Sequence, residues 1–165
     1  MPAVNSATMS VSDETLDELV PSYFEHTSAE DFQTLSPPDV SGILRSHCAL
    51  AGVRTPGTAN VRVFTPHPDT DGWGRGLVVA QIVTDDMPFL VDSVTMALDQ
   101  THHDVHLVIH PQLVCRRDVG GTLQEVLDDQ ADSGPHDVSR ESWMHLEIDR
   151  VPEEELGEIQ ELLAK

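Results

Sequence analysis

The chain has 165 residues, 39% of them hydrophobic and 4% aromatic, and a formal net charge of −20 at pH 7. This length allows one ordinary hydrophobic core and a small appendage. So acidic a chain disfavours nucleic acids and anionic membranes as partners, because both carry charge of the same sign. The sequence has no apolar run of membrane-spanning length, and residues 1–10 lack signal-peptide features, which indicates a cytoplasmic protein.

Residues 13–60 are predicted to form a helical N-terminal segment. Residues 1–12 are small and polar without periodicity, which is typical of disorder. Ser12 is a suitable cap for a first helix, and Pro21 is expected to interrupt or kink that helix. A second helix is predicted from Pro37 to Gly52.

Residues 61–165 are predicted to form an α+β domain, because strand and helix patterns alternate along them. The clearest pair is a buried strand over residues 77–84, whose one polar residue before Thr84 is Gln81, and a helix over residues 88–101. The other predicted elements are a strand at Val61–Phe64, a loop over 65–76, a long strand over 105–117, a turn at Gly120 and Gly121, a weak strand or helix over 123–127, a loop over 130–140, a strand over 143–149 and a helix from Pro152.

This order lacks the last strand that a β-α-β-β-α arrangement needs to complete its sheet. Either Val61–Phe64 fills the open edge, or the missing strand lies beyond Lys165. We favour the second possibility, in which the chain is a fragment of a longer protein.

The strand over residues 143–149 alternates in polarity, so its two faces are predicted to differ. Its inward residues are Met144, Leu146 and Ile148, and its outward residues include Trp143, His145 and Glu147. An exposed tryptophan suggests an interface with another domain or subunit. The alternative is that a helix or loop of the same chain covers this face.

The turn between the buried strand and the following helix is the first candidate site. A helix start presents unpaired backbone N–H groups that can bind a carboxylate, and neighbouring aspartates can hold an ammonium group. The turn therefore suggests a site for a small zwitterion such as an amino acid. Its candidate residues are Asp85, Asp86, Pro88, Phe89, Asp92 and Ser93. The alternative is that they are ordinary turn, cap and surface residues.

Four histidines near the next strand form a second candidate, for a metal site: His102, His103, His106 and His110. Positions four apart in a strand lie about 13 Å apart, so His106 and His110 cannot share an ion unless another element folds over them. A partly exposed helix-to-strand turn is therefore preferred, and no metal is predicted.

Catalytic motifs are absent from the sequence. It has no Gly-x-Ser-x-Gly elbow, no glycine-rich dinucleotide fingerprint after a strand and no phosphate-binding loop. Its one lysine is Lys165. We therefore predict that the chain is not catalytic by itself and binds no cofactor.

Three segments, residues 78–94, 109–118 and 141–150, resemble the N-terminal region of the large bacterial NAD-specific glutamate dehydrogenases. The resemblance implies an ACT-like, ferredoxin-like sandwich: an antiparallel sheet with two helices on one face. In that family the dehydrogenase core, with its NAD, lies far downstream. One departure concerns Phe89, which stands where ligand-binding ACT turns have glycine, so a packing role gains weight there.

The resemblance also implies a function. The chain would be a regulatory or assembly domain of an enzyme of amino-acid catabolism that converts L-glutamate, NAD and water to 2-oxoglutarate, ammonium and NADH. Its partners would be downstream domains of the same polypeptide, further subunits of a homo-oligomer and an amino-acid effector. The alternatives are a structural or oligomerisation module without ligand, or a metal-binding sensor.

Overall fold

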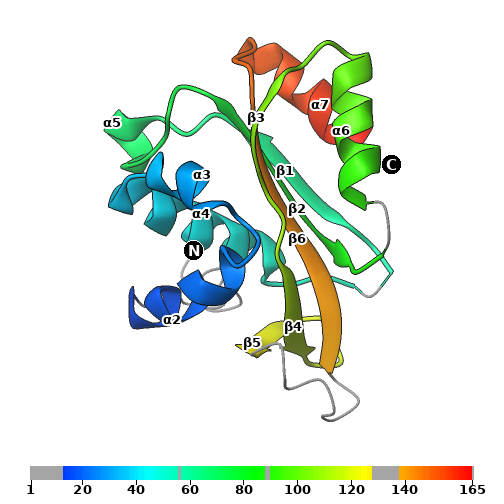
Figure 1. The fold of residues 1–165 in the computed structure, drawn as a ribbon. Coiled ribbons are helices and arrows are strands. Elements are labelled where there is room, and N and C mark those ends of the chain that lie inside the picture. The colour runs from blue at the N-terminus through cyan, green and yellow to red at the C-terminus, as the bar shows by residue number, and fades with distance from the viewer. Residues whose placement is uncertain (1–12, 56, 88–89, 128–137, 165) are drawn as a thin grey trace.

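The computed structural model describes residues 13–55, 57–87, 90–127 and 138–164 (Figure 1). The predicted disorder of residues 1–12 lies outside these residues. The helices are α2 (Asp13–Tyr23), α3 (Ala29–Gln33), α4 (Pro37–Ala51), α5 (Pro68–Asp71), α6 (Leu90–Gln100), the 3₁₀ turn η1 (Glu153–Glu155) and α7 (Leu156–Leu163). The strands are β1 (Asn60–Phe64), β2 (Val78–Asp85), β3 (Val105–Ile109), β4 (Gln112–Arg117), β5 (Leu123–Leu127) and β6 (Val138–Ile148).

All six strands form one antiparallel sheet in the order β1-β2-β6-β4-β5, with β3 also paired to β6. Strand β6 is central, because β2 lies along one side of it and β3 and β4 follow each other along its other side. Helix α6 connects β2 to β3 across β6. This split β-α-β arrangement confirms the predicted ACT-like α+β fold.

Helices cover both faces of this sheet (Figure 1). Helices α6 and α7 pack on the face formed by the alternating apolar residues of β2 and β6, such as Ala80 and Leu146. Helices α2 and α4 pack on the opposite face, against Val79, Val83 and Trp143. The predicted pair of helices on one face is present, and the N-terminal helices add a second covered face.

Helix α4 has a well-defined start. Ser36 and Asp39 form a capping box in which each side chain accepts a hydrogen bond from the other residue's backbone N–H, and Pro37 occupies the first turn. In the middle of the helix, Gly42 lies directly against the indole of Trp73. The predicted second helix is thus confirmed, and its glycine is explained by this close approach.

Strand β1 lies at the sheet edge beside β2, where Val63 pairs with Ala80. The backbone N–H of Val63 donates a 3.0 Å hydrogen bond to Oε1 of Gln160 in α7, which caps part of this edge. The open edge next to β2 is therefore filled by Val61–Phe64, which is the possibility that we did not favour from the sequence.

Several predicted boundaries were wrong. The long strand over residues 105–117 is divided at His110–Pro111, because proline has no N–H to continue the ladder. Instead, the carbonyl of Pro111 accepts a 3.1 Å bond from the N–H of Trp143. Helix α2 continues through Pro21 rather than ending there, and the short helices α3 and α5 lie in segments without a predicted helix. Strand β6 begins at Val138, inside the predicted loop.

Candidate functional site

The candidate acidic turn begins with Asp85, the last residue of β2. Its Oδ1 accepts a 2.8 Å bond from Nη2 of Arg54, and its Oδ2 accepts a 2.9 Å bond from the N–H of Gly57. The side chain of Asp85 is 42% exposed, whereas that of Arg54 is 1% exposed. Asp85 therefore neutralises a buried arginine, and its carboxylate is not free to hold an ammonium group.

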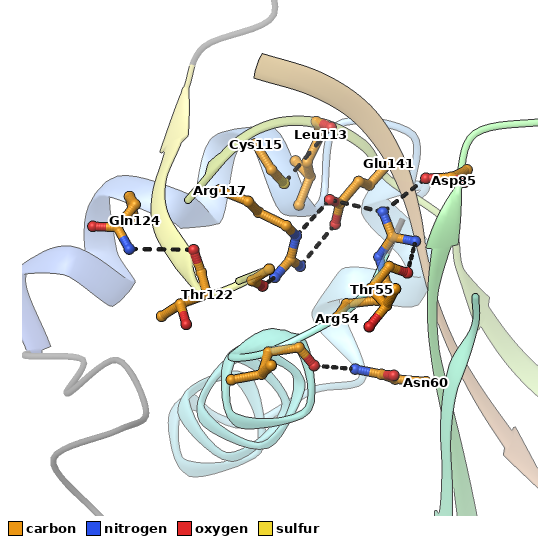
Figure 2. Close-up of polar contacts among 12 residues, drawn as sticks. Arg54, Thr55, Asn60, Asp85, Leu113, Cys115, Arg117, Thr122, Gln124 and Glu141 are labelled. Carbon is orange, nitrogen blue, oxygen red and sulfur yellow. Dashed lines mark hydrogen bonds and ion pairs between the residues drawn. The ribbon is translucent and has the colours of Figure 1, made fainter. Parts of the chain in front are cut away.

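Arg54 is one of three charged residues in a buried cluster with Glu141 and Arg117. Figure 2 shows the carboxylate of Glu141 lying between the two guanidinium groups. Arg54 donates from Nη2 at 3.0 Å, and Arg117 donates from Nε at 2.7 Å and from Nη2 at 3.0 Å. The indole N–H of Trp143 donates a further bond of 3.2 Å to Glu141. With Asp85, the cluster pairs two cations with two anions.

The pKa values in the cluster follow from these contacts. Burial opposes the charge on Glu141, but the bonds from Arg117 and Arg54 outweigh it and lower the pKa of this carboxyl group. Burial likewise opposes the charge on Arg54, and the carboxylates of Asp85 and Glu141 raise its pKa. Both shifts favour the charged forms, so Glu141 and Arg54 form a buried ion pair at neutral pH.

Local backbone geometry positions the two arginines. Arg116 and Arg117 are consecutive in β4 and lie on opposite faces of the strand, so Arg117 is buried at Glu141 while Arg116 pairs with Glu125 near the surface. Gly121 has φ of +88°, and a Cβ there would lie 2.4 Å from the carbonyl oxygen of Arg54. This glycine allows the turn to approach Arg54, whose N–H bonds to the Gly121 carbonyl at 3.0 Å.

Asp86 has its own partners. Its Oδ1 accepts bonds from the hydroxyl of Ser142 at 2.8 Å and from the side-chain amide of Gln112 at 3.2 Å. Pro88 and Phe89 lie outside the described residues. Asp92 and Ser93 are exposed on α6.

The surroundings of Asp92 differ from those of Asp85 and Asp86. Asp92 lines an open groove of about 630 Å³ between α6 and β3, with Thr95, Met96, Asp99, His103, Asp104 and Val105. Neither Asp85 nor Asp86 lines that groove.

The predicted exposure of the outward face of β6 was wrong. Trp143 and His145 are fully buried and Glu147 is 2% exposed, because α2 and α4 pack over them. Their predicted direction is correct, since they lie on the face opposite Met144 and Leu146. The alternative, that helices of the same chain cover this face, is confirmed.

Polar groups on this covered face satisfy one another. The amide of Gln81 donates to Nδ1 of His145 at 3.0 Å, and Nε2 of His145 donates to Glu147 at 3.0 Å. Arg75 donates to the other oxygen of Glu147 at 2.8 Å and to the hydroxyl of Thr34 at 2.8 Å. Burial opposes the charge on Glu147, but His145 and Arg75 lower its pKa. Through Arg75, this network connects the loop after β1 and the segment after α3 to Glu147 on the sheet.

A second buried histidine, His47 on α4, links this helix to α2 and the sheet. Its Nε2 donates to the carbonyl of Ile82 at 3.1 Å, so Nδ1 accepts the hydroxyl of Tyr23 at 2.6 Å. Burial lowers the pKa of His47 to about 3. The neutral imidazole is therefore part of the packing between the helices and the sheet.

The four histidines of the candidate metal site do not come together. His106 contacts the carboxylate of Asp149 at 2.5 Å, whereas His103 lines the groove beside α6. His102 has a positive φ of 64° in the turn after α6. Over the described part of the chain, no three histidine, cysteine or acidic side chains form a group that could hold a metal ion.

Sequence reasoning missed the residues that form the buried charge cluster and network, chiefly Arg54, Arg75 and Arg117. Two signals were available: Gln81 is the one polar residue in the apolar part of β2, and β6 alternates charged with apolar side chains. Both indicate a polar layer facing a covered side of the sheet. None of the described helices is long and apolar enough to cross a lipid bilayer.

Comparison with known proteins identifies the family. The sequence model of the family described as "Glutamate dehydrogenase, ACT1 domain" matches residues 19–163. The NAD-specific glutamate dehydrogenase of Pseudomonas aeruginosa is 40% identical over 90 residues, which cover 54% of this chain and 5% of that protein. That of Halomonas elongata is 34% identical over 95 residues, or 58% of this chain and 6% of that protein.

The chain thus spans only a small part of the length of these relatives. No solved structure matches it significantly. The predicted resemblance to the NAD-specific glutamate dehydrogenases is confirmed, and this chain belongs to the glutamate dehydrogenase ACT1 domain family.

Proposed function

We propose that this chain is a regulatory or assembly domain of a large cytoplasmic NAD-dependent glutamate dehydrogenase. The parent enzyme would convert L-glutamate, NAD and water to 2-oxoglutarate, ammonium and NADH in domains downstream of this one. The observation that carries the proposal is the match of residues 19–163 to the ACT1 domain of glutamate dehydrogenases. The domain would act through those downstream domains and the other subunits of a homo-oligomer.

The sequence supports a non-catalytic role for this domain. Hydride transfer to NAD needs a dinucleotide site, and the sequence contains no such fingerprint. The resemblance implies that lysines handle the glutamate carboxylate and the imine chemistry, and Lys165 is the one lysine here. The domain would therefore influence activity that resides elsewhere in the polypeptide.

Within this proposal, assembly is favoured over effector binding at the acidic turn. A ligand ammonium group would have to displace Arg54 from Asp85, or Ser142 and Gln112 from Asp86. Displacing Arg54 would leave a buried cation with fewer partners, which costs several kcal/mol. Whether an amino-acid effector binds at this turn is therefore tested by substituting Asp86.

The test uses the full-length enzyme that carries this domain and a version that lacks it. We expect the isolated domain to form no NADH, and removal of the domain to change the oligomer mass or the response of the enzyme to amino acids. Mass photometry and initial rates of NADH formation measure both. An unchanged oligomer with unchanged rates and responses would contradict the proposal.

The effector version has its own control. If an amino acid acts through the turn, Asp86→Asn removes its effect on the rate, while Asp69→Asn on the exposed helix α5 does not. An amino-acid effect that persists in Asp86→Asn would show that the effector does not act through this turn.

A further inference from the structure

Cations are scarce in this chain, and nearly all of them have partners. There are 9 lysines and arginines against 29 aspartates and glutamates. The arginines that contact a carboxylate or an aromatic ring, or that have another interaction partner, are Arg45, Arg54, Arg62, Arg75, Arg116, Arg117 and Arg140. Among the residues described, Arg150 is the one arginine with neither an ion pair nor a hydrogen bond nor a ring contact.

Arg150 is exposed and lines a groove of about 420 Å³. One wall comes from the segment after β1, with Thr65 and His67, and the other from the segment after β6. The second wall continues through Val151, Pro152 and Glu153. Two segments far apart in the sequence thus form one concave surface around the unpaired guanidinium group.

Three polar side chains of this groove can donate hydrogen bonds. Arg150 presents a guanidinium fork that matches a carboxylate, and Thr65 and His67 add a hydroxyl and an imidazole. The side chains of Thr65 and His67 have no hydrogen-bond partner among the described residues. The groove therefore has unused donors beside an unused cation, in a protein whose other described arginines are engaged.

The remaining lining residues restrict what can bind. Val151 and Pro152 offer apolar surface, so a ligand with a short apolar portion gains from contact with them. Glu153 and the net charge of −20 repel a second negative group, which disfavours dicarboxylates and phosphates. An ammonium group on the ligand can instead pair with Glu153.

We propose that this groove binds the carboxylate of a small monocarboxylate with a short apolar chain, held by Arg150 between the segments after β1 and β6. The proposal concerns binding alone, and it does not depend on the proposed role in glutamate dehydrogenase. Because the groove is open to solvent, we expect a dissociation constant on the order of 1 mM.

The test is a titration of the chain, followed by ¹H–¹⁵N NMR, with three probes of similar shape. 4-Methylpentanoate has the carboxylate alone, L-leucine adds an ammonium group, and 3-methylbutylamine has the ammonium group alone. We expect saturable shifts for the two acids at residues of the groove, such as Thr65 and Val151, and none for the amine. Tighter binding of L-leucine would assign its ammonium group to Glu153, whereas equal binding would assign recognition to the carboxylate.

Matched variants distinguish binding in the groove from a general effect of the net charge. Arg150→Gln is expected to weaken binding of both acids about tenfold or more, since a charge-assisted hydrogen bond is removed. Arg116→Gln removes the same charge at the far end of the sheet and should leave binding unchanged. Equal weakening in the two variants, or no saturable shift with the unsubstituted chain, would overturn the proposal. A melting temperature preserved in both variants shows that binding, not folding, was changed.

Discussion

Arg117 donates two hydrogen bonds, at 2.7 and 3.0 Å, to the two oxygens of the fully buried Glu141 carboxylate. The same carboxylate neutralises Arg54, so its loss leaves two buried guanidinium groups with a single counter-charge, Asp85. We predict that Glu141→Gln lowers the free energy of unfolding by about 3–5 kcal/mol. Urea denaturation followed by tryptophan fluorescence measures this change.

The matched control for this prediction is Glu125→Gln. Glu125 also pairs with an arginine, Arg116, but both side chains are about two-fifths exposed. Exposed ion pairs contribute about 0–1 kcal/mol, so this substitution should leave the stability nearly unchanged. Equal effects of the two substitutions would show that burial of the Glu141 cluster has no energetic role.

Gly42 and Trp73 give a second prediction, in which a normally favourable substitution becomes unfavourable. Alanine stabilises a helix interior by about 1 kcal/mol relative to glycine. At position 42, however, its Cβ would lie 2.1 Å from Cγ of Trp73. We expect Gly42→Ala to displace the indole and to lower the free energy of unfolding by about 1–3 kcal/mol. Equilibrium denaturation and a shift in tryptophan emission would detect both effects.

Gly157 in α7 serves as the control, because no atom lies within 4 Å of a Cβ built there. Gly157→Ala should raise the stability by a few tenths to about 1 kcal/mol. The two substitutions are thus predicted to have opposite signs, and a gain in stability at both positions would refute the packing of Trp73 on α4.

The neutral, buried His47 predicts how stability depends on pH. Its pKa is about 3 in the folded chain and 6.5 when unperturbed, so between these values the unfolded chain binds the extra proton. The contribution of His47 is complete above pH 6.5 and is lost as pH falls towards 3, at about 1.4 kcal/mol per pH unit. We expect this slope in denaturation experiments between pH 6.5 and 5.

His47→Gln keeps a hydrogen-bond donor and an acceptor on α4 but cannot titrate. It should lose most of the slope between pH 6.5 and 5, whatever its absolute stability. His67→Gln, on the exposed segment after β1, should keep the slope of the unsubstituted chain. A slope that survives in His47→Gln would assign the pH dependence to another group.

Much of the fold could be predicted from the sequence, because strong local signals determine it. The apolar run of β2 and the alternation of polar and apolar residues in β6 each predict a strand. The capping residues and the proline at the start of α4 predict a helix. What local patterns could not show is which faces are covered. Trp143 was therefore expected at the surface, although α2 and α4 bury it.

The candidate site was less predictable, because its energetics depend on contacts between distant positions. Asp85 was identified as a ligand-binding carboxylate from its neighbours in sequence, yet its main partner, Arg54, lies 31 residues away. Arg117 and Glu141 are also remote from that turn in the sequence. No spacing rule connects these residues, since β4, β6 and the segment after α4 are brought together only by the complete sheet.

The central position of β6 has a consequence for the order in which the chain folds. Among the described strands it is the last to leave the ribosome, yet β2, β3 and β4 all pair with it. During synthesis the β1–β2 pair can form early, but β2 and β4 lack their shared neighbour until β6 arrives. Pairing of Val83 with Trp143 then closes a loop of 60 residues in one step. This step is slow, because the chain loses the entropy of loop closure before it gains the contacts between the strands. A nascent chain that stalls before Val138 would therefore expose the open edges of β2 and β4, where β6 normally pairs, to chaperones and proteases.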